Sequence, residues 1–393
     1  MLSQINKKIF FEWIAAFILI LNSGHYLIMK TNSYIGLVLL LLLCLLLLIS
    51  TREFKLKINN LLLFLIIGAV FSSVANFTLE NLLATGRFCI TLLAICYIFT
   101  HLLPERVFQK IFKMIEGIII TSILFKVLTL IIDPYIIPTF DEYYNLFILS
   151  QRIDGRIVGV FWESGVFSSI IILAFLINIL IFEKEATPFQ WMIFTIGILA
   201  TESTAGILLC LTLIFAFSYN NFFQEKSFFF KAILLVSLLI VIFNLQTIFY
   251  FLAEFYPKVF HKLIDSELET VQTRLIGPLI NLDIFLQNPF FGLGFPGAAA
   301  LYAQEIGYTS VVAQTSTSTQ LLSAIGIIGC LYSLGFLGLL CRSYQITSLS
   351  KFILLLIIFA ILNKEPHIFN AISLSLLYIL SSRYIPVNEN EKM

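Results

Sequence analysis

Apolar blocks recur along this chain at a length that suits the crossing of a lipid bilayer. Runs rich in Leu, Ile and Phe extend for roughly 16 to 23 residues between shorter polar segments. An α-helix rises 1.5 Å per residue, so about 20 residues cross a hydrocarbon core of ~30 Å. The pattern predicts an all-α, polytopic helical membrane protein, with residues 1–393 forming a single integral membrane domain.

About twelve transmembrane helices are expected from these runs. They are placed at 9–29, 34–50, 60–77, 83–103, 112–132, 166–182, 189–201, 204–220, 228–250, 316–340, 351–364 and 367–382. The seventh run is short, and a tight turn at Glu202 and Ser203 joins it to the eighth. This pair is therefore open to two interpretations, namely two full crossings or a re-entrant hairpin.

The short loops divide into a basic set and a nearly neutral set. The basic loops hold Lys7, Lys8, Arg52, Lys55, Lys57, Arg106, Lys110, Lys113, Lys184, Lys226, Lys231, Arg342, Lys351 and Arg383. The other short loops hold only Lys30 and Lys364. Because cytoplasmic loops carry the excess of Lys and Arg, both termini are expected in the cytoplasm. The two long polar islands, 133–165 and 251–315, then form extracytoplasmic loops.

Composition narrows the function classes. Of the 393 residues, 59% are hydrophobic and 12% charged, and the net charge of +1 argues against a nucleic-acid partner. The six cysteines lie in or beside apolar runs without a CxxC pair, which favours small buried hydrophobes. Neither metal-ligand spacing of histidines nor a nucleotide-binding glycine motif occurs, so no metal and no cofactor are expected. The first apolar run lacks a small-residue cleavage site, so we expect no cleavable signal peptide.

The segment QRIDGRIVGVFWESG, residues 151–165, is the most informative polar stretch. Its charged residues are Arg152, Asp154, Arg156 and Glu163. Gly159 lets the backbone come close to a ligand. We expect Arg152, Asp154 and Gly159 to contact substrate, although a surface turn with Gly155 is the alternative for Asp154.

The second island carries Arg274 and the run NPFFGLGFPG. Ser266 with Glu269 fits a capping box, Gly277-Pro278 interrupts the helix that follows, and Asn288-Pro289 ends it. We therefore expect a broken amphipathic helix along the membrane face, with Arg274 near the break. The residues expected to contact substrate after this helix are Asn288, Gly292 and Gly294.

Arg156 and Arg274 are the leading catalytic candidates. Arginine supplies a positive charge that does not depend on pH, in a fork that matches phosphate oxygens. The alternative is that each caps a helix or pairs with a nearby carboxylate. Glu163 begins an apolar span, where it is suited either to deprotonating an attacking hydroxyl or to complementing the helix dipole.

Three charged residues fall within or between apolar runs. An ionised group at mid-bilayer costs at least about 2.5–3.5 kcal/mol, so Arg87 is expected to face the bundle interior. There it either lines the substrate cavity or pairs with Glu116. Lys126 lies close to the outer interface, where it is expected to snorkel. Glu202 either meets an arginine or substrate, or sits in solvent. The hydroxyl-rich stretch at 315–320 is open to helix capping or substrate contact.

Four stretches, in order, resemble the O-antigen polymerase and ligase superfamily, the Wzy-type repeat-unit polymerases and their relatives. GRIVGVF at 155–161 resembles the Arg-x-x-Gly-x-Phe signature after a long external loop. ATESTAGILL at 200–209 is similar to the family's Thr/Ser-plus-Gly turn. TRLIGPLINLDIFLQNPFFGLGF at 273–295 and TSTQLLSAIGIIGCL at 317–331 resemble the surface helix and the Gly-Ile-Ile-Gly helix that follow.

Some positions depart from the family pattern. Thr204 stands where the turn often carries arginine, and Glu163-Ser164 where Asn-Pro is common. The ligase branch has a histidine before its last motif helix, where this chain has Thr and Ser. The absence of this histidine favours the polymerase branch over the ligase branch.

The resemblance implies a membrane-embedded, GT-C-like, metal-independent inverting glycosyltransferase of the bacterial inner membrane. Its substrate would be a polyprenyl-diphosphate-linked oligosaccharide, polymerised outside the membrane for O-antigen, capsule or exopolysaccharide. Arg156 and Arg274 would stabilise the diphosphate, and Glu163 would position or deprotonate the acceptor. The lipid bilayer and a chain-length regulator protein are the implied partners. The alternatives are a ligase of the same superfamily and a flippase for lipid-linked oligosaccharides.

Overall fold

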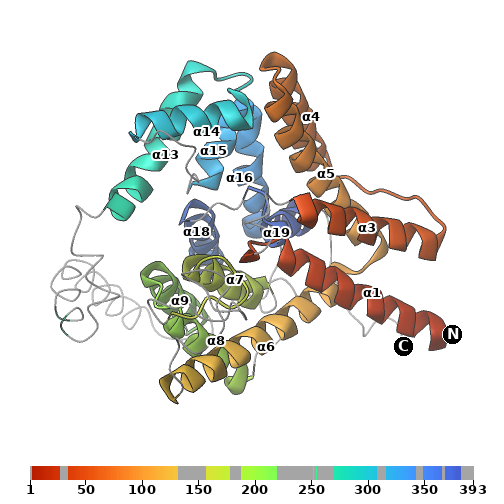
Figure 1. The fold of residues 1–393 in the computed structure, drawn as a ribbon, viewed down its shortest axis with the longest axis vertical. Helices are drawn as coiled ribbons and strands as arrows, with labels where there is room; N and C mark the ends of the chain where they lie inside the picture. The colour runs from red at the N-terminus through yellow and green to blue at the C-terminus, as the bar shows by residue number, and fades with distance from the viewer. Residues whose placement is uncertain are drawn as a thin grey trace.

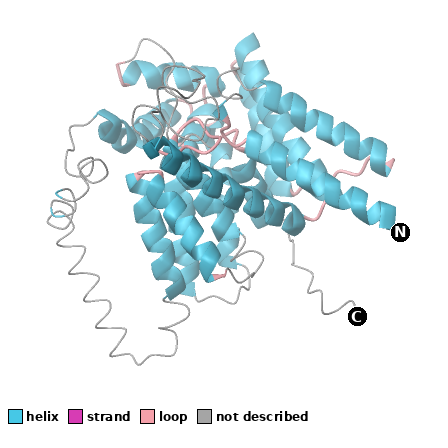
Figure 2. Ribbon diagram, turned by 60° about the horizontal axis from the view of Figure 1, so that its bottom comes forward, coloured by secondary structure: helices cyan, strands magenta, loops and turns pink. Residues whose placement is uncertain are grey.

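The computed structural model describes residues 2–26, 34–131, 156–177, 187–218, 251, 254, 269–307, 316–341, 348–364 and 368–381. Within these ranges the regular elements are helices, and the only β-type pairing is an isolated antiparallel bridge between His25 and Phe161. In Figure 2 the described residues form helices and connecting loops. The expected span at 228–250 and the capping residue Ser266 lie outside the described residues.

The helices follow the apolar runs in chain order. They are α1 (Leu2–Leu21), α3 (Tyr34–Thr51), α4 (Asn60–Ala75), α5 (Leu79–His101), α6 (Pro104–Ile131), α7 (Ser164–Leu176), α8 (Pro188–Ala200), α9 (Thr204–Ser218), α13 (Glu269–Gln287), α14 (Gly294–Glu305), α15 (Thr317–Ile325), the 3₁₀ helix η3 (Gly326–Gly329), α16 (Cys330–Phe336), α17 (Gly338–Cys341), α18 (Ser348–Lys364) and α19 (Ala371–Ser381).

Three helical segments in the described part are long and apolar enough to cross a membrane. They are Tyr34–Thr51, Leu79–His101 and Thr317–Leu340. Shorter apolar helices of 10–17 residues occur at Asn60–Ala75, Ser164–Leu176, Pro188–Ala200, Thr204–Phe217, Ile276–Gln287 and Ala371–Ser381. In the described residues, the helices and these three segments agree with the expected all-α membrane protein.

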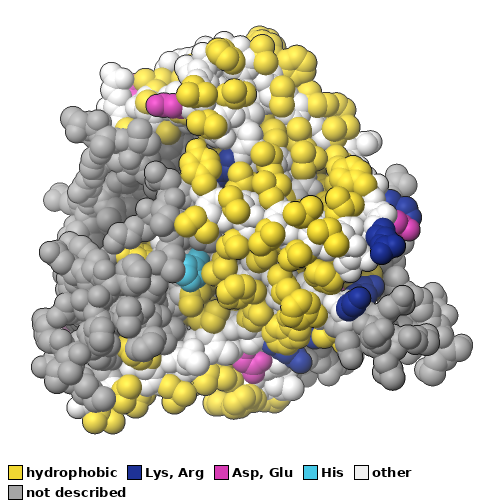
Figure 3. All heavy atoms as spheres, turned by 45° about the vertical axis from the view of Figure 1, so that its right-hand side comes forward, with side chains coloured by type: hydrophobic (Ala, Val, Ile, Leu, Met, Phe, Trp, Pro, Cys, Tyr) yellow, Lys and Arg dark blue, Asp and Glu magenta, His cyan; other side chains and the backbone are white. Residues whose placement is uncertain are grey.

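Two central helices are apolar on every face and are buried on every face. All residues of α7 are buried, and so are those of α19 from Ala371 to Leu380. A helix that is hydrophobic all round belongs in a core. In contrast, α3 and α4 expose Leu, Ile, Val and Phe side chains, which gather into the apolar surface of Figure 3. An exposed apolar surface of this kind is suited to contact with lipid.

Two groups of helices lie on either side of α18. In Figure 1, α13, α14 and α15 lie on one side of the molecule and α7, α8 and α9 on the other, and α18 packs against both α9 and α15. One end of the bundle is tied together by backbone bonds. The Tyr26 N–H donates to Val160 O at 3.1 Å, the Trp162 N–H to Gly24 O at 3.1 Å, and the Ala371 N–H to Asn22 O at 3.3 Å.

Three boundaries differ from those expected, and each has a local or tertiary cause. The first helix ends at Leu21 rather than near residue 29, because the Asn22 and Ser23 side chains donate to Ile18 O and Leu19 O and close the helix. The helix around Pro278 is not broken: α13 runs from Glu269 to Gln287 with Pro278 inside it. Its end before Asn288 agrees with the expectation.

The third difference is that the run at 316–340 is not one regular helix. It passes from α15 through the 3₁₀ turn η3 into α16. Gly326 has a φ of 67°, and a Cβ there would collide with the backbone of Phe290. The change of helix type therefore lies where the loop after α13 crosses this segment.

Candidate functional site

The turn from Thr201 to Ser203, between α8 and α9, places a carboxylate in a buried position. Glu202 has a φ of 51°, an uncommon conformation for a residue other than glycine. The Glu202 N–H donates to Leu199 O at 3.0 Å, and the Thr201 hydroxyl donates to Ile198 O at 2.6 Å. The Glu202 side chain is only 8% exposed. Strain of this kind persists where surrounding contacts hold it, and it is frequent at functional sites.

Two cations from other segments meet this carboxylate. Lys126 of α6 places its Nζ 3.2 Å from Glu202 Oε1, and Arg156 places its Nε 3.8 Å from Glu202 Oε2. The Lys126 and Arg156 side chains are 30% and 18% exposed. Lys126 therefore forms an ion pair within the bundle, where snorkelling to the interface was expected. Glu202 contacts an arginine, which was one of the expected possibilities, and its side chain is not exposed to solvent as the alternative required.

The segment that carries Arg156 is held against the bundle by its backbone. The Ile157 N–H donates to Ala200 O at 3.2 Å, at the end of α8. Gly159 has a φ of +59°, and a Cβ there would lie 2.9 Å from side-chain atoms of Ile118 and Phe167. Glycine at this position lets the segment approach α6 and α7 closely, so its observed role is in packing.

A third cation, Lys364, also contacts this turn. It is the last residue of α18 and is 8% exposed. Its ammonium donates to Ser203 Oγ at 3.0 Å, to Ser168 Oγ at 3.2 Å and to Gly165 O at 3.2 Å. Since Ser203 follows Glu202 directly, one turn joins cations from α6, the 156–163 segment and α18.

Glu163 lies beside this group. It is half-buried at the N-cap of α7, two residues before the Gly165 carbonyl that Lys364 contacts, and its side chain makes no capping hydrogen bond. A carboxylate at a helix N-terminus is favoured by the helix dipole, as one of the two sequence interpretations holds; the other, deprotonation of a hydroxyl, stays a prediction.

Hydrogen bonds continue from α18 to α15 and α13. Next to Lys364, the side chains of Asn363 and Ser316 are 2.8 Å apart, and the Thr319 hydroxyl donates to Ser316 Oγ at 2.6 Å. The Asn281 amide donates to Thr319 Oγ1 at 3.3 Å, and Ser323 Oγ donates to Asn281 Oδ1 at 3.3 Å. This polar chain runs from Asn363, the residue before Lys364, to the middle of α13.

The hydroxyl-rich stretch forms part of that chain and does not provide a simple helix cap. Ser316 makes no side-chain capping bond to α15. In the described part, Ser318 Oγ and Gln320 Oε1 are buried without a hydrogen-bond partner. Buried polar atoms are normally bonded, so such atoms favour a region that a polar ligand completes.

Arg274 occupies α13 seven residues before Asn281, which is about two helical turns. Its side chain lies outside the described residues, and so do Arg152 and Asp154. The backbone of Arg274 therefore lies on α13, the helix at which the polar chain ends. The contacts of its side chain are not described.

Arg87 lies over an aromatic ring in the described structure. Its guanidinium carbon lies 4.1 Å from the centroid of the Phe369 ring. Phe369 belongs to the short connection between α18 and α19. No ion pair joins Arg87 to Glu116 in the described part, so the expected pairing is wrong there. A cation over an aromatic face is stabilised by the ring quadrupole, which accounts for an arginine within α5.

The turn after α13 packs against α4, α5 and α15. Asn288 is exposed, and its carbonyl accepts from the Gly292 N–H at 2.9 Å. The Leu293 N–H donates to Ser323 O at 2.9 Å, and the Phe295 N–H to Asn81 Oδ1 at 3.2 Å. Gly292 and Gly294 both have positive φ, and a Cβ at either position would collide with neighbouring atoms. These backbone N–H groups donate to acceptors within the protein. The observed role of the turn is therefore to pack neighbouring helices together.

The sequence reasoning missed Lys364, Ser168, Ser203 and Asn281 as members of the site. Lys364 was used only in the count of loop charges. A single lysine at the end of an apolar helix was the available signal, because a cation there needs either water or buried partners. The two serines and Asn281 carried no local signal.

No family model matches the chain, and no curated protein is significantly similar to it.

Proposed function

We propose that this chain is a membrane-embedded, metal-independent glycosyltransferase that polymerises oligosaccharide repeat units linked to a polyprenyl diphosphate. The observation that supports the proposal is the convergence of Lys126, Arg156 and Lys364 on one buried turn. A departing diphosphate develops negative charge, and cations held in a site of low water content stabilise that charge strongly. The neighbouring hydroxyl and amide groups suit the recognition of sugar hydroxyls.

In the proposed reaction, a hydroxyl of the acceptor unit attacks the anomeric carbon of the donor chain. The new C–O bond forms as the bond from that carbon to the diphosphate oxygen breaks, with inversion. Glu163 takes the hydroxyl proton, and the polyprenyl diphosphate leaves with the bonding electrons. Arg156 and Arg274 bind the diphosphate, while Glu202 holds Arg156 and Lys126 in place by its two ion pairs.

The proposal includes a GT-C-like arrangement of about twelve spans in the bacterial inner membrane, with both termini cytoplasmic and the reaction on the outer side. The length of α6 agrees with this placement. Lys126 lies 22 residues after Pro104, so ~33 Å of helix separates the cluster from the basic start of α6. The lipid tails of both substrates would lie in the bilayer, and a chain-length regulator protein would act as partner.

What accumulates in a deletion strain distinguishes this function from its alternatives. Loss of a polymerase leaves single repeat units on lipid or on the final acceptor, without long chains. Loss of a ligase leaves long chains on the polyprenyl carrier, and loss of a flippase traps single units on the cytoplasmic leaflet. Gel and mass analysis of the lipid-linked glycans makes the distinction. Long chains persisting on the carrier would refute the polymerase assignment.

A further inference from the structure

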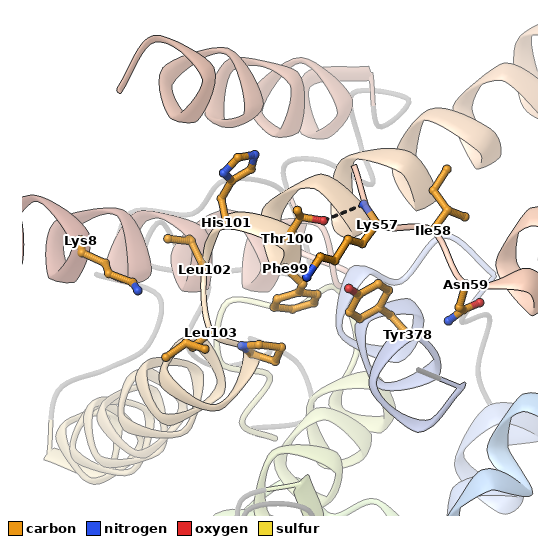
Figure 4. A pocket seen from close by; sticks show the side chains of 11 residues that line it. Lys8, Lys57, Ile58, Asn59, Phe99, Thr100, His101, Leu102, Leu103 and Tyr378 are labelled. Carbon is orange, nitrogen blue, oxygen red and sulfur yellow. Dashed lines mark hydrogen bonds between the residues drawn. The ribbon is translucent and has the colours of Figure 1, made fainter. Parts of the chain in front are cut away.

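A polar cavity lies at the other end of the bundle from the cation cluster. It has a volume of about 520 Å³, and its polar lining comes from Lys8, Lys57, Asn59, Thr100, His101 and Tyr378. Figure 4 shows the Lys8 and Lys57 side chains entering it from opposite sides. Leu103 and Pro104, which also line it, place it at the start of α6, ~33 Å of helix away from Lys126.

The segment between α3 and α4 holds the second lysine in position. The Lys57 N–H donates to Thr100 Oγ1 at 2.9 Å, and the Asn59 amide donates to Ser381 Oγ at 2.7 Å. The neighbouring Lys55 is engaged elsewhere, because its ammonium lies 2.7 Å from Glu53 Oε2. That contact lowers the pKa of Glu53 below its ordinary value. The Glu53 charge is thereby matched by Lys55.

Other polar groups at this cavity favour an anionic ligand. In the described part, His101 lines the cavity, and its Nε2 is buried without a hydrogen-bond partner. The carboxylate of Glu12 does not line the cavity, and it is paired with Arg106 at 3.9 Å. Basic pockets between helices at the cytoplasmic side of a membrane protein suit the headgroups of anionic lipids.

An apolar groove adjoins the cavity. Its volume is about 420 Å³, and it lies between α3 and α5, lined by Leu41, Leu45, Leu48, Ile90, Leu93 and Tyr97, among others. The Tyr97 and His101 rings are 4.6 Å apart, so the groove and the cavity meet at this pair. Ile90 lies 11 residues before His101, or ~16 Å along α5, which is close to half of a ~30 Å hydrocarbon core.

We propose that the groove and cavity together bind one anionic phospholipid of the inner leaflet. Its phosphate lies between Lys8 and Lys57, and one acyl chain follows the groove between α3 and α5. The polar cavity and the apolar groove lie next to each other, as the headgroup and an acyl chain of a phospholipid do. The lipid would join α1, α5 and the 52–59 segment, remote from the site of glycosyl transfer.

The test uses the full-length protein purified in a neutral detergent. Retention of added phosphatidylglycerol and phosphatidylcholine is measured by native mass spectrometry, and the affinity by a thermal-stability titration. We expect phosphatidylglycerol alone to be retained. The double variant Lys8→Gln/Lys57→Gln should bind it about 30-fold more weakly, which corresponds to ~1 kcal/mol for each lysine. The control variant Lys55→Gln should bind it as the unmodified protein does.

A second pair of variants tests the groove without changing charge. Leu45 lines it and is 50% exposed, whereas Leu42 is 48% exposed and does not line it. Leu45→Trp should reduce lipid retention several-fold, and Leu42→Trp should not. Equal retention of the two lipids, or retention insensitive to the lysine and Leu45 variants, would overturn the proposal. Equal protection by inorganic phosphate at the concentration of the lipid would also overturn it, in favour of a free-anion site.

Discussion

Replacement of Glu202 by glutamine is the most informative perturbation of the candidate site. Glutamine keeps the shape of the side chain and the conformation of the turn, and it removes the charge that Lys126 and Arg156 share. Both cations then remain near each other without their carboxylate. We expect a less stable protein that forms little polymer, because Arg156 loses the contact that orients it.

The magnitude follows from the geometry of the Lys126–Glu202 pair. At 3.2 Å and an effective dielectric constant of ~20, the Coulomb attraction is about 5 kcal/mol. This value is an upper limit, because burial removes hydration from both charges and the Lys126 side chain is still 30% exposed. We therefore expect a coupling energy of about 1–3 kcal/mol between the two side chains.

A double-mutant cycle measures that coupling. Unfolding of the unmodified protein, Glu202→Gln, Lys126→Met and the double variant is followed in mixed detergent micelles of increasing denaturing power. The exposed pair Lys55–Glu53, with side chains 68% and 57% exposed, serves as the control and should show no measurable coupling. If the coupling of Lys126 with Glu202 is no larger than in the control, the reasoning about this site is refuted.

The other predictions concern the reaction, the packing and the topology. Arg156→Ala and Arg274→Ala should each lower polymer formation by about 10²–10³ at unchanged protein level, with poor rescue by lysine; near-normal glycan ladders in complemented deletion cells would exclude them from the mechanism. Gly294→Ala should destabilise the protein by at least about 1–3 kcal/mol, since its φ is +74° and a Cβ would collide with Asn81; unchanged unfolding in detergent would contradict this. Cysteine introduced at residue 262 should be labelled from outside intact cells and cysteine at residue 55 should not, in a background without native cysteines; the reverse pattern would reject the topology.

Much of the helical framework followed from local properties of the sequence. The apolar runs at 34–50 and 60–77 correspond to α3 and α4, because an unbroken apolar run of this length satisfies its backbone polar groups by forming a helix in lipid. Asn288-Pro289 marked the end of α13 for an equally local reason, since the residue before proline disfavours the helical conformation. Glu202 stood out because it is a charge in a tight turn between apolar runs.

The composition of the site was decided by the tertiary structure. Lys364 is 161 residues from Ser203 in the chain and 196 from Ser168, and its role appears only when α18 packs against α7 and α9. The same holds for Gly292 and Gly326, which look like flexible or ligand-binding glycines and are instead points of close backbone contact between distant segments. Hydropathy and periodicity report how each segment meets lipid or core. They contain no information on which buried polar groups meet one another, because that depends on how helices distant in the chain pack together.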